Sequence, residues 1–147
     1  GFFMTYLKPL PVSVKLSFFG PSFTGNPTAG DYFTLTVGNT NDLGISGTGT
    51  TTLSIPQGTY HVRSAIGGDK SSQEYITFQW ELGGVLVGNQ AGWDAEISAT
   101  DKRISCEYAE YVFNVTSTTN LRLKCIGHGG TVTINGDYSG AIIKGVQ

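Results

Sequence analysis

The stretch Glu74–Gly88, EYITFQWELGGVLVG, carries the strongest structural signal in this chain. Its first nine residues alternate in character, and one face collects Ile76, Phe78, Trp80 and Leu82. A period of two is typical of a half-buried β-strand. The pair Gly83–Gly84 then separates this run from a second apolar run. Both residues of a two-residue hairpin turn need positive φ, which glycine adopts freely, so the stretch predicts an antiparallel hairpin.

Similar alternation recurs at short spacing along the chain, with Gly, Pro, Asn and Ser between the runs. Besides the two strands of the hairpin, the segments expected to form strands are 12–19, 31–38, 51–55, 59–66, 95–99, 102–107, 109–116, 120–127, 131–134 and 139–146. Loops are expected at 20–30, 39–50 and 89–94. His128 is placed in the tip of a hairpin, after which 131–134 pairs back onto 120–127.

This pattern predicts an all-β chain, because no window shows the period of a helix. Glycine, which marks turns, accounts for 21 of the 147 residues. No linker divides the sequence and no repeat of fixed period appears, so residues 1–147 are expected to form a single domain. About ten antiparallel strands in one domain indicate a sandwich, a jelly roll or a barrel.

Composition and charge exclude several functional classes. The formal net charge of −2 argues against a nucleic-acid partner, which would require a basic surface. No run of 18 apolar residues is present, so membrane insertion is not expected. No signal peptide is visible, and we interpret Met4 as the natural start, with Gly1–Phe3 as an addition. Cys106 and Cys125 allow one disulfide without requiring it.

Four stretches resemble the complement-type globular head and tumour necrosis factor (TNF) superfamily. The first is Pro-x-Gly-x-Tyr between two strands, in LSIPQGTYHVRSA (Leu53–Ala65). The others are the hairpin ITFQWELGGVLV, the strand and turn NLRLKCIGHGG, and the closing segment DYSGAIIKGV, which resembles the family's last strand beside the first strand. The resemblance implies an antiparallel jelly-roll sandwich of about ten strands that assembles as a compact homotrimer.

The same heads occur at the tips of bacteriophage fibres and spikes, and the low charge of this chain, 14% Asp, Glu, Lys and Arg, resembles that viral branch. Our main hypothesis is therefore a non-enzymatic trimeric phage fibre, spike or capsid-decoration head on the virion surface. Its partner would be a host-surface glycan or a virion protein. Two alternatives remain open: a monomeric carbohydrate-binding module of a secreted bacterial enzyme, and a secreted, extracellular ligand head of the animal type.

Two clusters are candidates for ligand binding. In the expected loop 89–94, an indole for stacking on a sugar ring is surrounded by amides and a carboxylate for its hydroxyl groups: Asn89, Gln90, Trp93 and Asp94. Alternatively, Trp93 closes the end of the sandwich. The second cluster is Asp137 and Tyr138, which a plain hairpin turn would also explain.

Four side chains are candidates for a trimer interface, because tyrosine combines a large apolar area with a hydrogen-bonding tip. They are Tyr60, His61, Tyr75 and Tyr111. Tyr60 belongs either to the core or to the three-fold axis. No spacing of catalytic residues or metal ligands stands out, so we predict no enzyme, no metal and no cofactor.

Overall fold

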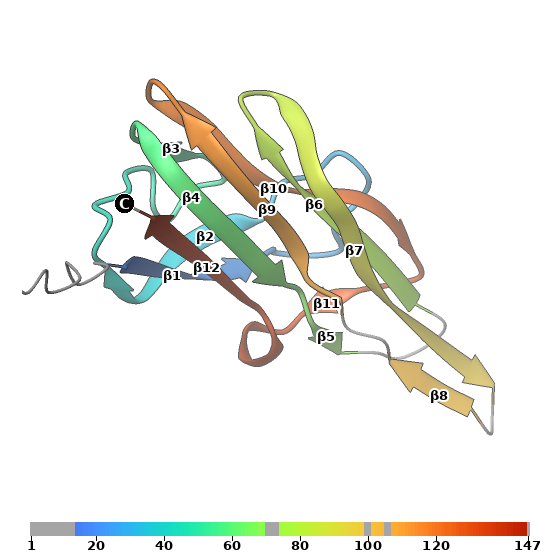
Figure 1. Cartoon of the computed structure of the whole chain (residues 1–147). Helices are drawn as coiled ribbons and strands as arrows, with labels where there is room; N and C mark the ends of the chain where they lie inside the picture. Colours follow the sequence, from blue (N-terminus) through green and yellow to red (C-terminus); the bar gives the residue numbers. More distant parts are fainter. Residues whose placement is uncertain (1–13, 70–73, 99–100, 105–106, 147) are drawn as a thin grey trace, which may run out of the picture.

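The computed structural model describes residues 14–69, 74–98, 101–104 and 107–146, and it folds them into two five-stranded antiparallel sheets packed face to face (Figure 1). Sheet A has the order β2-β1-β12-β4-β9 and contains β1 (Lys15–Ser22), β2 (Thr34–Asn41), β4 (Gly58–Ala65), β9 (Ala109–Val115) and β12 (Gly140–Val146). Sheet B has the order β3-β10-β6-β7-β8 and contains β3 (Leu53–Ile55), β6 (Glu74–Leu82), β7 (Val85–Ser98), β8 (Asp101–Ile104) and β10 (Thr119–Gly129).

A short third pairing joins β5 (Gly68–Asp69) to β11 (Thr133–Ile134), and one 3-10 turn, η1 (Gly136–Tyr138), leads into β12. The last strand, β12, lies between β1 and β4, as the resemblance implies. The predictions of an all-β, antiparallel sandwich and of ten strands in its two main sheets are confirmed.

The core lies between the sheets and is built by the predicted alternation. Its largest fully buried side chains are Phe33, Leu35, Leu53, Ile55, Ile66, Ile76, Phe78, Trp80, Leu121, Leu123 and Ile143. The indole N–H of Trp80 donates to the carbonyl of Ala109, 3.1 Å away, so the buried ring leaves no polar atom unpaired. The hairpin turn is also confirmed, since Gly83 and Gly84 have φ of 58° and 83°.

The predicted loop 89–94 is wrong, because these residues continue strand β7 opposite β6. The loop signals Gly88 and Asn89 instead mark an irregularity in the strand, where its register against β6 shifts between Phe78 and Trp80. Gly88 has φ of 71°, and a Cβ on it would meet the carbonyl oxygen of Glu110 at 2.2 Å. Only glycine therefore allows β7 to approach β9 so closely.

The pairing predicted for 131–134 is also wrong. These residues do not return along the preceding strand: β11 pairs with β5. Strand β10 continues past the expected turn to Gly129, so His128 lies within a strand and not in a hairpin tip. The ring of Tyr75 lies where a Cβ on Gly129 would be, 2.2 Å from its Cε1, and this contact requires glycine there.

The Pro-x-Gly-x-Tyr step has a direct physical explanation. The Tyr60 hydroxyl donates to the carbonyl of Pro56, 2.8 Å away, so the ring folds back over the turn. A Cβ on Gly58 would lie 3.0 Å from that hydroxyl and 3.2 Å from the ring carbons. The glycine thus makes room for the tyrosine at the start of β4.

Candidate functional site

The outer face of sheet A, the side turned away from the core, is unusually apolar. Its apolar side chains come from β1, β4, β9 and β12: Leu16, Phe18, Ala65, Val112, Ile142 and Val146. Val112 is 63% exposed and Val146 is 46% exposed, whereas Leu16, Phe18 and Ile142 are half-buried. Water-exposed apolar side chains gathered on one sheet face are typical of an interaction surface.

A shallow depression of about 310 Å³ lies on this face, lined chiefly by Phe18, Ala65, Gly140 and Ile142. Its rim carries Arg63, whose guanidinium carbon sits 3.7 Å from the centroid of the Tyr108 ring. This is cation–π distance, and it holds the arginine flat against the tyrosine. The depression thus combines an apolar floor with a cationic edge.

Charged side chains run across the same face from one strand to the next. His61 on β4 lies opposite Val112 of β9 and opposite Lys144 of β12. Its Nε2 is 2.5 Å from Oε1 of Glu110. In the described part of the chain neither Arg63 nor Lys144 pairs with a carboxylate, so this face carries two cations beyond the His61–Glu110 pair.

The outer face of sheet B differs from it at Glu81, because the charge of this carboxylate is paired. Glu81 is only 7% exposed, and its carboxylate accepts from the Tyr32 hydroxyl at 3.0 and 3.1 Å. Lys124 Nζ lies 3.6 Å from the same carboxylate. The guanidinium carbon of Arg122 lies 4.9 Å from the centroid of the Tyr32 ring, and the ammonium nitrogen of Lys124 lies 5.5 Å from it. This network holds the segment around Tyr32 against β10.

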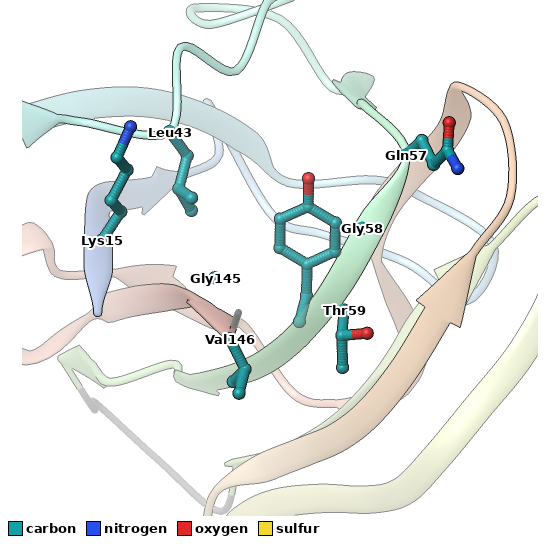
Figure 2. Close-up of a pocket in the computed structure, with 8 residues that line it drawn as sticks. Lys15, Leu43, Gln57, Gly58, Thr59, Gly145 and Val146 are labelled. Atoms are coloured by element: carbon teal, nitrogen blue, oxygen red, sulfur yellow. The ribbon is translucent and has the colours of Figure 1, made fainter. Parts of the chain in front are cut away.

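A cavity of about 150 Å³ opens at one end of sheet A, beside the Pro-x-Gly-x-Tyr turn (Figure 2). Tyr60 lines this cavity together with Leu43, Gly58 and Val146. The polar groups at its edge, Lys15, Gln57 and Thr59, are spread around the opening and do not converge. We therefore assign the cavity no ligand.

The four predicted interface residues do not share one face. His61 lies on the outer face of sheet A, and Tyr75 lies on the outer face of sheet B, where it is 45% exposed. Tyr111 turns toward the core and stacks on Phe113, with ring centroids 5.9 Å apart. Tyr60 is 4% exposed and belongs to the core, the first of the two positions left open for it.

The six predicted ligand-binding residues divide between β7 and η1. Asn89 is already engaged: its amide donates to the Tyr108 carbonyl at 2.7 Å and accepts from the Glu110 N–H at 3.0 Å, joining β7 to β9. Gln90 is exposed, and Trp93 and Asp94 stand opposite Ile76 and Tyr75 in the ladder.

On the other element, Asp137 is exposed, and its backbone N–H is capped by the side chain of Asn135 at 2.9 Å. Tyr138 is 66% exposed, and its Cβ lies 2.3 Å from where a side chain on Gly67 would begin. Local packing therefore accounts for the position of η1, and binding by either residue stays a prediction.

The remaining reactive groups give no sign of chemistry. Cys125 is a free, buried thiol, and burial together with the nearby Asp31 raises its pKa to about 11, which makes it unreactive at neutral pH. Cys106 lies outside the described residues. Over the described ranges, no three His, Cys, Asp or Glu side chains gather as metal ligands, and no helix is long and apolar enough to span a bilayer.

Comparison with solved structures defines the class of fold. By sequence, the chain matches no known protein family and no curated protein. Its structure nevertheless has the TNF-like jelly-roll fold, as the sequence resemblance predicted.

Among the structures it resembles is murine APRIL at pH 8.0, with a TM-score of 0.60 and 8% identity over 91% of this chain and 100% of that one. Another is Eiger TNF from S. frugiperda, with a TM-score of 0.58 and 9% identity over 91% of this chain and 93% of that one. At such low identity the likeness establishes the fold and nothing finer.

The outer face of sheet A is the feature that the sequence interpretation missed. Its signal was visible as adjacent apolar residues, Phe18–Phe19 in one strand and Ile142–Ile143 in another. In an isolated sandwich, one residue of each pair points to the core and the other to solvent. Strands that are apolar on both sides are typical of sheets that are covered on both faces.

Proposed function

We propose that this chain is a non-enzymatic head domain that associates as a homotrimer through the outer face of sheet A and binds a partner protein outside the cell. The observation that carries the proposal is the apolar outer face of sheet A, which contrasts with the buried, paired Glu81 carboxylate of sheet B. The TNF-like fold supports it, since the resemblance implies trimeric assembly.

Assembly is tested by light scattering coupled to size exclusion at micromolar concentration. A mass of three chains is expected, and a chain that stays monomeric at that concentration would overturn the proposal. A monomer would instead agree with the carbohydrate-binding module.

A secreted ligand head is favoured over a phage head because the similar structures include murine APRIL and an insect Eiger TNF. The phage hypothesis depends on the low charge of the chain.

The labelled trimer should bind to animal cells and lose that binding after the cells are treated with protease. If binding disappears after glycosidase treatment alone, the ligand is a glycan, and the loss of binding after Trp93→Ala would assign it to β7. Binding to bacterial cells only would support the phage head.

A further inference from the structure

The outer face of sheet A carries a histidine at a position where the proposed assembly would remove water. His61 lies on β4, next to the edge strand of the sheet, with β12 on one side and β9 on the other. Its side chain is 26% exposed in the single chain. A histidine is the side chain whose charge ordinarily changes between about pH 5 and 8.

Charged groups from the neighbouring strands surround His61. From β9 comes Glu110, 2.5 Å from Nε2, and from β12 comes Lys144, directly opposite in the ladder. Arg63 lies two residues further along the same strand. β1, beyond β12, adds Leu16 and Phe18 to this face, and neither carries a charge.

The charge on this cluster depends on pH in a simple way. With His61 neutral, Glu110 offsets one of the two cations Lys144 and Arg63, which leaves a single positive charge on each copy. Protonation of His61 raises this to two positive charges. Like charges that come together at a desolvated interface repel, and an unpaired charge there is costly.

We infer that His61 makes assembly sensitive to acid: the sheet A faces associate at neutral pH and separate as His61 gains a proton. The inference rests on the proposed homotrimer. The sign follows from linkage, because a proton that binds the free copy more tightly than the assembled copy weakens assembly when the pH falls. Glu110 faces His61 in the free and in the assembled copy, whereas the cations of the other copies oppose the added charge only when the faces meet.

Sedimentation equilibrium at about pH 8 and about pH 5.5, on either side of the histidine range, tests this inference. The wild-type trimer is expected to weaken at least about tenfold in acid, which corresponds to about 1.4 kcal/mol in the free energy of assembly. His61→Gln should remove most of that change, and Lys144→Gln should reduce it. The chain has two histidines, so His128→Gln, on sheet B, is the matched control and should behave as wild type.

The possible failures are distinguishable. A wild-type chain that is monomeric at both pH values overturns the proposed function and this inference with it. A trimer that is equally stable at both, that tightens in acid, or whose acid sensitivity survives in His61→Gln overturns the inference alone. Near-ultraviolet circular dichroism at the lower pH verifies that the separated chains remain folded.

Discussion

The two sheets of this sandwich treat their solvent sides differently. On sheet B, Glu81 is nearly buried, with Tyr32 and Lys124 around it, so its charge has partners. On sheet A, Val112 and Val146 are exposed to water, and among the described residues Arg63 and Lys144 have no carboxylate partner. A face whose polar groups are satisfied within the chain needs no cover. A face that exposes apolar area is stabilised by whatever removes that area from water.

The largest effect is expected from a charge placed on the apolar outer face of sheet A. Val112→Glu puts a carboxylate on the sheet A face, on the edge strand β9, where assembly would desolvate it at a cost of several kcal/mol. We expect the trimer to dissociate into folded monomers, measured by light scattering. Asn120→Glu, on an exposed position of sheet B, is the matched control and should keep the wild-type mass. If both variants remain trimeric, the interface lies elsewhere.

A substitution on sheet B is expected to have a smaller effect. It should lower the stability of the folded chain and leave assembly unchanged. Tyr32→Phe removes the hydroxyl that donates to Glu81 at 3.0 Å and leaves a nearly buried carboxylate without its donor. Hydrogen bonds to charged groups contribute about 1.5–3 kcal/mol, so the free energy of unfolding should fall by about 2 kcal/mol in urea. The trimer dissociation constant, measured below the unfolding transition, should stay unchanged. A large change in that constant would mean that sheet B also takes part in assembly.

The sequence predicted the inner side of both sheets better than the outer side. Alternation identifies which residues face the core, so the buried residues around Trp80 and Leu123 could be predicted from the sequence. The outer sides depend on contacts between strands that are distant in the chain. Tyr32 meets Glu81, 49 residues away, and Tyr75 covers Gly129, and nothing local encodes either contact.

The errors at β7 have a related cause. Gly88 and Asn89 are turn-forming residues, but here the glycine allows a close approach to β9 and the asparagine satisfies the backbone of that strand. Their role is visible only once β9 lies beside β7. Turn signals therefore locate irregular backbone, and only the fold decides whether it is a loop or a bulge.

Tyr75→Ala sharpens the comparison, because Tyr75, which the sequence predicts at the interface, covers Gly129 on sheet B. Loss of an aromatic ring over a strand glycine should lower the free energy of unfolding by about 1 kcal/mol, the scale of a cross-strand pair. Chemical denaturation measures this loss. Assembly should be unaffected, and a trimer weakened more than a few-fold would place Tyr75 at the interface after all.

The last comparison is between the two sides of a single strand, β4. His61 and Tyr60 are neighbours on β4, but the first faces outward and the second lies in the core. Tyr60→Phe removes the 2.8 Å hydrogen bond to Pro56 and should lower the free energy of unfolding by about 1 kcal/mol at neutral pH, with no change in the trimer.

The loss of stability in Tyr60→Phe is expected to depend on pH. Burial raises the pKa of the Tyr60 phenol above its ordinary value of 10.0, so the folded chain keeps its proton where the unfolded chain has begun to lose it. The wild type therefore loses stability as the pH rises above about 10. Tyr60→Phe lacks this contribution, so the difference between the two proteins should shrink in alkali, as urea midpoints at a series of pH values would show. A difference that instead grew with pH would mean that the ionised phenol is stabilised where it lies, and Tyr60 would not be the core residue that its burial indicates.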